Sequence, residues 1–197
     1  MAPLTKYPGM SLRQLIYDYR HQALVLFKCA LLQSKMLFFG TKCEKICMMQ
    51  FALVSLIPGL IRHLEDCSDP ELDTYSSNAC TPSSLKTSDR NSLLEYMGLP
   101  LQIFGKGSFF GPYTPLQQLD LLNDTSTISY IAGSTNILLL QAREGGPEIL
   151  IDVDEKTITI NDLPLRPALA LSTADRRWID GIPVSYTHLT LPTNREV

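Results

Sequence analysis

The sequence has no surplus of basic residues. Its 17 Lys and Arg residues are outnumbered by 20 Asp and Glu residues, which gives a net charge of -3, and the basic residues are scattered rather than striped. A protein that binds nucleic acid needs a basic patch to neutralise phosphates. We therefore expect no nucleic-acid partner.

The sequence also has few cysteines. There are five, an odd number, and Cys29, Cys43 and Cys47 lie in apolar segments, where a thiol usually behaves as a small hydrophobic group. This pattern does not indicate a disulfide framework. We expect a reducing, cytoplasmic setting.

No apolar run is long enough to cross a membrane. The longest uncharged stretch, residues 46–61, is shorter than the about 20 residues that span the hydrocarbon core, and it contains Pro58 and Gly59. The first residues, MAPLTKYPGMS, lack the continuous apolar core of a secretory signal. We expect a buried helix at 46–61, no transmembrane span and no targeting segment.

The N-terminal third begins with a helical pattern followed by a strand pattern. From Ser11, which suits a helix N-cap, apolar residues recur at steps of three and four and predict one helix ending near Gln33. The apolar run at 36–39, closed by Gly40, is typical of a buried strand.

A second helix is predicted directly after this strand. Thr41 and Glu44 have the spacing of a capping box, and Pro58 stops or kinks the helix, with Phe51 and Val54 packed inside. Helix, buried strand and helix in succession indicate an α/β fold with parallel strands joined by crossovers. The chain of 197 residues, 45% hydrophobic, is long enough for one domain with a core.

Residues 66–91 change in composition to Ser, Thr, Asp, Pro and Asn, with almost no large aliphatic side chains. Burial of such a segment cannot offset the entropy lost on ordering it. We predict a flexible, dispensable insertion, which contains Cys67 and Cys80.

Regular patterns return after the insertion. We predict an extended segment at 99–104, a helix from Thr114 and Pro115, a strand at 129–132, a turn at 133–136, a hairpin of strands 148–153 and 157–160, and a last helix that begins at Ser172 with Asp175 at N3.

The C-terminal segment has an unusual sequence. The stretch VSYTHLTLPT, residues 184–193, resembles the in-frame translation of a sequencing-library transposon end. The alternative is a genuine β-like tail, since this stretch is rich in β-branched and aromatic residues. We prefer the first interpretation, because a ten-residue match to one tag is more specific than a propensity, and expect residues 184–197 to be non-native and adapter-derived.

Two patterns superficially suggest ligand sites. Cys43 and Cys47 lie one helical turn apart, but no second Cys or His pair accompanies them, as a structural zinc site requires. Gly105-Lys106-Gly107 lacks the full Walker spacing and is interpreted as a turn. We predict no metal-binding and no cofactor-binding residues.

Catalytic patterns are not apparent either. Asp152, Asp154 and Glu155 cluster as in a calcium loop, but the loop's Gly and distal Glu are missing, so we expect a solvated hairpin tip. His21 is expected on a polar helix face and His63 at a helix C-terminus, with no nucleophile partner for either. We predict no catalytic residues and no enzyme.

Two blocks, residues 9–68 and 98–180, resemble one known family. They carry short motifs such as LFK, SLIPG, GSTN and TAD in a fixed order. The single positions that we take from these motifs are Arg20, His21, Lys28, Pro58, Gly59, Lys106, Gly107, Gln117, Gln118, Gly133, Asn136 and Asp175. This pattern is similar to the central DENN region of the AVL late-secretory-pathway family.

The resemblance implies an α/β central DENN lobe, with a mixed or mostly parallel sheet flanked by helices and truncated at both ends. Residues 1–65 would form its first half, 66–92 an insertion, and 93–183 its second half with the start of a C-terminal lobe. The family positions have no assigned role.

The resemblance also implies a function in vesicle trafficking. A DENN protein of this type is expected to act as a guanine-nucleotide exchange factor for a Rab-type small GTPase, peripheral to late-Golgi or endosomal membranes. The alternative is a scaffold that uses the same α/β lobe without nucleotide exchange. A small-molecule enzyme of doubly wound fold would need a Gly-rich phosphate loop after a strand, and the sequence does not supply that spacing.

Overall fold

A single five-stranded sheet organises the chain. The structure is a computed structural model that describes residues 10–65, 67–71, 88–89, 92–93, 96–98, 100–140 and 145–187. The strands are β1 (Lys35–Phe39), β2 (Ser108–Gly111), β3 (Ser129–Ser134), β4 (Ile149–Asp152) and β5 (Thr157–Ile160), in the order β2-β3-β1-β4-β5. All neighbours are parallel except β4 and β5, so the predicted mostly parallel α/β sheet is confirmed.

Strand β1 lies at the centre of this sheet. Its sequence KMLFF is apolar at three successive buried positions, which is typical of a strand covered on both faces. Leu37 pairs with Ala132 of β3 on one side and with Leu150 of β4 on the other. The buried strand predicted at 36–39 is therefore confirmed.

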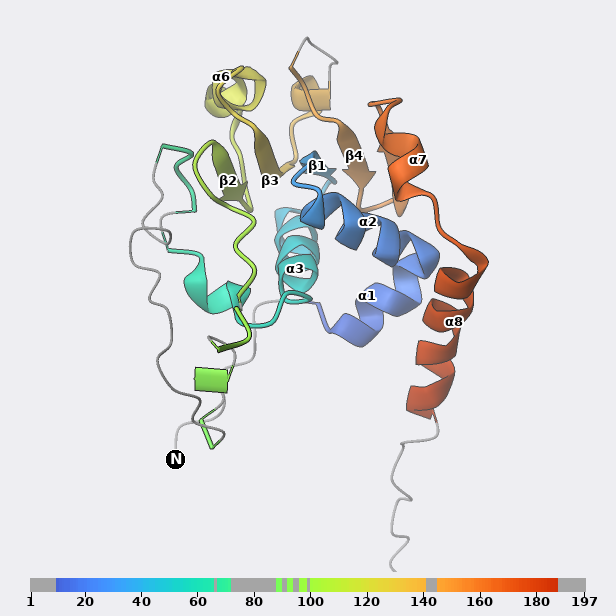
Figure 1. Ribbon diagram of the computed structural model, residues 1–197. Helices are drawn as coiled ribbons and strands as arrows, with labels where there is room; N and C mark the ends of the chain where they lie inside the picture. The colour runs from blue at the N-terminus through green and yellow to red at the C-terminus, as the bar shows by residue number, and fades with distance from the viewer. Residues whose placement is uncertain are drawn as a thin grey trace, which may run out of the picture.

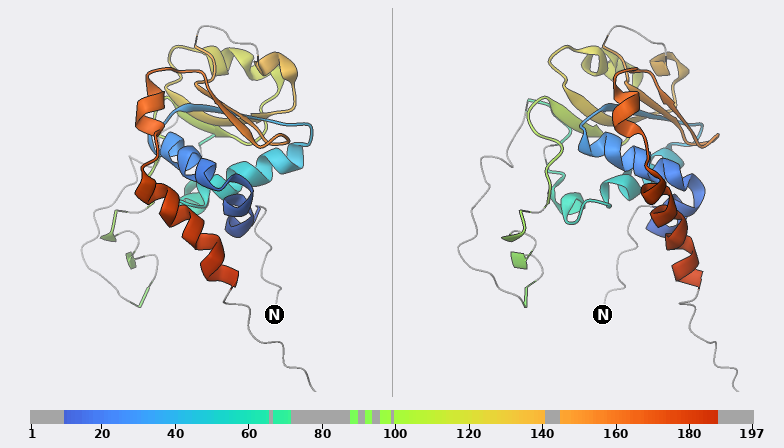
Figure 2. Two further views of the ribbon diagram at one scale, coloured as in Figure 1. Left: turned by 90° about the vertical axis from the view of Figure 1, so that its right-hand side faces the viewer. Right: turned by 45° about the vertical axis from the view of Figure 1, so that its right-hand side comes forward.

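Helices cover both faces of the sheet, as Figure 1 and the left view of Figure 2 show. On one face, α1 (Leu12–Tyr19), α2 (His21–Leu31), α3 (Cys43–Val54) and α7 (Leu165–Leu169) pack around Met36 and Phe38. The opposite face carries the shorter η2 (Leu116–Gln118), α6 (Leu119–Asn123) and η3 (Ile137–Leu140), with a smaller cluster around Leu37 and Phe109. Helix α8 (Thr173–Thr187) packs on α1 and α2.

The single helix predicted from Ser11 to Gln33 is two helices. Ser11 is the N-cap as expected, since its Oγ accepts a hydrogen bond from the Gln14 backbone N–H at 3.2 Å. Arg20, however, has a φ of 45°, which breaks the helix after Tyr19. The break turns the chain while the apolar stripe continues, so that both helices bury side chains in the same core.

Helix α3 forms without the predicted capping box. Its N-cap is Lys42 with no side-chain hydrogen bond, because Thr41 is engaged by Asp154 instead. The helix ends at Val54, before Pro58. Val54 is buried as predicted, whereas Phe51 is half-buried and packs edge-on against Phe110 with ring centroids 5.4 Å apart.

The sequence predicts a buried helix rather than a membrane span at 46–61. Among the residues that the structure describes, no helix has both the length and the apolarity needed to cross a bilayer.

The first residues of the predicted insertion are anchored to the sheet. Cys67 is buried in the main core, which corrects its placement in a flexible segment. The backbone N–H of Phe110 donates to the Cys67 carbonyl at 2.6 Å, and that of Gly107 donates to the Pro70 carbonyl at 2.7 Å. Residues 72–87 of the predicted insertion, including Cys80, lie outside the described residues.

Strand β2 was missed by the sequence analysis. The extended segment predicted at 99–104 forms no strand over residues 100–104, and the strand begins only after the turn at Lys106 and Gly107. The predicted helix start near Pro115 is confirmed, because Pro115 is the N-cap of η2.

The predicted strands and helix in the last third of the chain are confirmed, but one predicted turn is not. The hairpin of β4 and β5 is confirmed, whereas Gly133 belongs to β3 rather than to a turn. At the start of α8, the Ser172 backbone N–H donates to Asp175 Oδ2 at 2.9 Å and the Asp175 N–H donates to Ser172 Oγ at 3.1 Å, which is a capping box.

The predicted non-native tail begins inside α8, which continues through Thr187. Residues 188–197 of that tail lie outside the described residues. The origin of the tail stays a prediction.

Candidate functional site

Helices α2 and α8 bring together three of the positions singled out by the family resemblance. His21 Nε2 lies 3.6 Å from Asp180 Oδ1, and Lys28 Nζ lies 3.9 Å from Asp175 Oδ2. Lys28 also donates to the Ala170 carbonyl at 3.0 Å. We call this line of contacts the α2–α8 seam. Arg20, also among the family positions, is exposed at the junction of α1 and α2 beside His21.

Hydrogen bonding favours the charged form of Asp175. The backbone N–H and the hydroxyl of Ser172, followed by the charge of Lys28, hold the pKa of Asp175 below its usual range. The carboxylate therefore caps its own helix and faces Lys28 at the same time. These contacts attach α8 at its N-terminal end.

The seam leaves an aromatic side chain uncovered. Trp178, the one tryptophan of the chain, is 60% exposed on α8, while the next residue, Ile179, is 3% exposed. Ile179 therefore anchors the inner face of the helix, and Trp178 extends from its outer side.

The other family positions are spread over the fold. Gly59 and Gly107 have φ values of 86° and 82°, which a side chain disfavours, so both serve backbone turns. Asn136 accepts a hydrogen bond from the Leu138 backbone N–H at 2.9 Å at the start of η3. Four more are exposed loop or helix positions: Pro58, Lys106, Gln117 and Gln118.

Gly133 is required by the packing of α3 on the sheet. A Cβ at this position would collide with Gln50 Nε2, the Pro112 carbonyl and Ile46 Cγ2. Gln50 is fully buried and donates from Nε2 to the Pro112 carbonyl at 3.0 Å. Gly133 thus allows a polar contact to form between α3 and the loop after β2.

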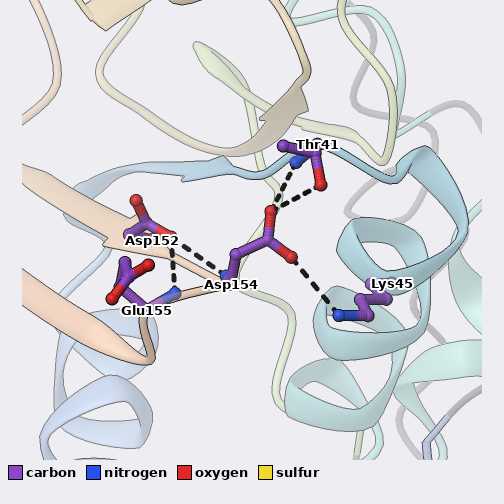
Figure 3. Close-up of polar contacts among 5 residues, drawn as sticks. All are labelled: Thr41, Lys45, Asp152, Asp154 and Glu155. Atoms are coloured by element: carbon purple, nitrogen blue, oxygen red, sulfur yellow. Dashed lines mark hydrogen bonds and ion pairs between the residues drawn. The ribbon is translucent and has the colours of Figure 1, made fainter.

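The carboxyl ends of β1 and β4 mark the place where a doubly wound sheet usually binds ligands. After β1 the chain passes through α3 toward β2 at one edge, and after β4 it turns into β5 at the other edge. Connections that diverge from two neighbouring parallel strands open a crevice between them. Figure 3 shows that the side chain of Asp154 lies at this point.

Asp154 is held there by three contacts. Its Oδ2 accepts hydrogen bonds from the backbone N–H of Thr41 at 2.6 Å and from the Thr41 hydroxyl at 2.8 Å, and its Oδ1 lies 3.3 Å from Lys45 Nζ. The Thr41 backbone, the Thr41 hydroxyl and then Lys45 hold the pKa of Asp154 below its usual range. Asp154 thus lies in the hairpin turn as predicted, but its carboxylate is bonded to the segment after β1 as well as being in contact with solvent.

Two further carboxylates fix the hairpin. Asp152 Oδ1 accepts the backbone N–H groups of Asp154 and Glu155, both at 2.9 Å, which shapes the turn. Lys156 lies 2.8 Å from Asp18 Oδ1 of α1. Burial alone would raise the pKa of Asp18, but hydrogen bonds from Lys156 and Gln14 outweigh burial and lower it.

A pair of thiols lies on the first turns of α3. Cys43 Sγ and Cys47 Sγ are 3.8 Å apart, with Cys43 exposed and Cys47 half-buried, so the expectation that Cys43 behaves as a small hydrophobic group is wrong. Burial and the neighbouring Cys43 raise the pKa of Cys47 to about 11. Within the described ranges, no group of three or more His, Cys, Asp and Glu side chains is arranged to hold a metal ion.

The Asp154 contacts and the role of Gly133 were not predicted from the sequence. Asp154 follows Thr41 by more than a hundred positions, so only the sheet order brings them together. The one available signal was the polar residue Gln50 among the apolar residues of the second half of α3.

The chain matches a family model described as the transport protein Avl9 over residues 3–191. It is 40% identical over 176 residues to the late secretory pathway protein AVL9 of Saccharomyces cerevisiae, covering 89% of this chain and 23% of that protein. It is 36% identical over 174 residues to the corresponding protein of Schizosaccharomyces pombe, covering 88% of this chain and 37% of that protein.

The chain thus spans well under half the length of these two curated relatives. The family match, by contrast, runs through every described helix and strand, including the α2–α8 seam and the hairpin of Asp154. The chain belongs to the Avl9 transport-protein family.

Proposed function

We propose that this chain is the central α/β part of a DENN-type protein that binds a Rab-type small GTPase and accelerates its nucleotide exchange in the late secretory pathway. Membership of the Avl9 family and the names of the two relatives support the place in the pathway. The mostly parallel sheet flanked by helices is the fold expected for such a lobe.

The contacts of Asp154 support a mode of action that does not involve a small ligand. At the carboxyl ends of β1 and β4, where a doubly wound enzyme usually binds its small ligand, the Asp154 carboxylate is bonded to Thr41 and Lys45. A regulator of a GTPase works differently, because it needs surface complementarity to the switch segments rather than acid and base side chains. The outer helical surfaces are therefore the parts of this chain available to a partner.

The face of α8 around Trp178 is the surface we propose for the GTPase. Tryptophan is enriched among the residues that dominate binding energy at protein interfaces. Ile179 attaches the helix that carries Trp178, and the contacts of His21 with Asp180 and of Lys28 with Asp175 set its direction. The family positions of the seam would then orient the binding helix.

Nucleotide-release kinetics test this function. A panel of purified Rab proteins loaded with fluorescent GDP would be mixed with the 197-residue chain and, in parallel, with the full-length Saccharomyces cerevisiae relative. Faster release from one Rab supports exchange activity. A Rab that binds without faster release favours the trafficking scaffold, and a panel in which no Rab binds either protein contradicts the proposal.

Substitution of Trp178 tests the surface. Trp178→Ala should weaken binding of the responsive Rab by about tenfold or more, as expected for a central interface aromatic. Tyr113→Ala removes another exposed aromatic side chain, in the loop after β2, and is the matched control. Equal loss of binding in both variants would argue against the α8 face.

The proposed location is peripheral to late-Golgi or endosomal membranes on their cytoplasmic side. An exchange factor of this kind reaches its GTPase at the membrane surface and does not need to span the bilayer. The absence of a sufficiently long apolar helix from the described part of the chain is consistent with this location.

A further inference from the structure

The two thiols of Cys43 and Cys47 are placed so that an ion can bridge them, but they are too far apart in the helix for a disulfide bond. Their Sγ atoms are 3.8 Å apart on successive turns of α3, one exposed and the other half-buried. A disulfide needs Cβ atoms about 3.5–4.5 Å apart. Residues i and i+4 of an intact helix hold their Cβ atoms at about 5–6 Å. Direct oxidation would therefore have to unwind the start of α3.

A bridging ion fits the same two atoms without such a change. Two thiolates at about 2.3 Å from a tetrahedral zinc ion lie about 3.8 Å from each other. The observed separation of 3.8 Å equals that value.

A third donor lies beside the pair. The Cys47 thiol donates a hydrogen bond to the carbonyl oxygen of Pro112, and the sulfur and oxygen atoms are 3.5 Å apart. A sulfur and an oxygen ligand on one tetrahedral zinc ion are separated by about 3.6 Å. Buried Gln50 donates to the same carbonyl at 3.0 Å and so fixes its direction, while a carbonyl oxygen keeps a second lone pair for another partner.

We propose that Cys43 and Cys47, with the Pro112 carbonyl as an additional ligand, form a site for a thiophilic divalent cation of the zinc class. Binding releases the two thiol protons, and the two thiolates neutralise the charge of the ion. A water molecule completes the tetrahedron. With only two thiolates, the site exchanges its ion and is not needed for folding, unlike a structural site with four protein ligands.

Cadmium ion is a suitable probe, because its bonds to thiolates give a charge-transfer absorption in the ultraviolet. The parent protein for the experiment carries Cys80→Ser, so that this cysteine, outside the described residues, cannot supply a further thiolate. Titration of the parent with Cd2+ should give the absorption band with one ion per chain. Excess Zn2+ should remove the band by displacing the cadmium ion.

Three variants make the assignment specific. Cys43→Ser and Cys47→Ser should each weaken Cd2+ binding by about tenfold or more, with an unchanged circular dichroism spectrum, because each removes one of the two thiolates. Cys67→Ala changes a buried thiol elsewhere in the core and should leave the titration unchanged. A parent without the absorption band, or a double variant Cys43→Ser/Cys47→Ser with the same band as the parent, would overturn the proposal.

Discussion

Gly133 shows how a single residue position can be set by packing alone. Its missing side chain makes room for the contact between buried Gln50 and the Pro112 carbonyl, in the middle of a fully buried strand. The Gln50 amide nitrogen and the Pro112 carbonyl oxygen are thereby partnered with each other. Packing of α3 on the sheet therefore requires the glycine at this position of the family motif.

We predict that Gly133→Ala destabilises the protein by about 1–3 kcal/mol, the usual cost of adding a methyl group to a packed core. The added Cβ would collide with backbone as well as side-chain atoms, so the neighbours cannot simply rotate away. Urea unfolding at neutral pH measures the loss. Gly105→Ala is the control, since a Cβ there meets nothing within 4 Å. Equal stability of the two variants would refute the packing argument.

The contacts of Asp154 make the stability of the folded protein depend on pH. Its carboxylate is stabilised in the folded state by Thr41 and then by Lys45, so its folded pKa lies below its unfolded value. The contribution to stability is therefore fully present above the ordinary aspartate pKa of about 4 and is lost as the pH falls through the lower, folded value.

We predict that Asp154→Asn lowers the melting temperature at neutral pH and reduces the loss of stability on acidification. Melting curves of the parent and variant between neutral and acidic pH should converge as the pH falls, because the parent then protonates the same group. Glu155→Gln, which neutralises the exposed neighbouring carboxylate, serves as the comparison. Parallel pH profiles for the parent and Asp154→Asn would contradict the assigned hydrogen bonds.

At the scale of elements, α8 is attached by a small area. Ile179 is its one described side chain that is fully buried, and the pairs His21–Asp180 and Lys28–Asp175 are partly exposed. Ion pairs in such positions contribute little to the free energy of unfolding, about 0–1 kcal/mol each. Burial of Ile179 must supply most of the attachment.

We predict that Ile179→Ala costs about 2–4 kcal/mol and loosens α8 before the sheet unfolds. Trp178 is the only tryptophan, so its fluorescence reports on this helix, while far-ultraviolet circular dichroism reports on the whole fold. In the variant the fluorescence transition should occur at lower denaturant concentration than the circular dichroism transition. Arg177→Ala, an exposed change on the same helix, should keep both transitions as in the parent.

Elements defined by local sequence were predicted well, and elements defined by distant contacts were not. The buried strand at β1, the hairpin and the Ser172 capping box depend on neighbouring residues and were correct. The break at Arg20 was missed because the apolar period continues across it. Thr41 was misassigned because its partner, Asp154, approaches only once the sheet has formed.

The same division applies to the candidate site. Motif comparison singled out His21, Lys28 and Asp175 but could not place them on facing helices. Trp178 was not selected, since an exposed aromatic side chain leaves no periodic signal in the sequence.

At the scale of the whole molecule, the two halves of the chain are interleaved. Strand β1, from the first 65 residues, pairs with β3 and β4, which both follow the predicted insertion. The central strand of the sheet and its two neighbours therefore come from different halves.

We predict that neither residues 1–65 nor residues 93–183 fold alone. The first piece would expose the apolar strand β1, and the second would leave β3 and β4 without the strand between them. Circular dichroism and thermal melting of the separate pieces should show no cooperative transition, whereas mixing the two should restore one. A cooperative transition in either isolated piece would contradict this prediction.

A peripheral location has its own test. We predict that alkaline carbonate releases the full-length protein from cell membranes, because the proposed attachment is through a GTPase and the membrane surface. Release is followed by immunoblotting of supernatant and pellet, with an integral membrane protein as the control. Retention of the protein in the pellet together with that control would contradict peripheral attachment.

The contact of Asp154 with Thr41 and Lys45 has a consequence for competition with dissolved anions. A carboxylate carried on the adjoining turn is presented to its partners at an effective concentration on the order of millimolar or higher. A weakly binding metabolite would have to exceed that concentration to displace it. The intramolecular contact therefore ties the β4–β5 hairpin to the start of α3.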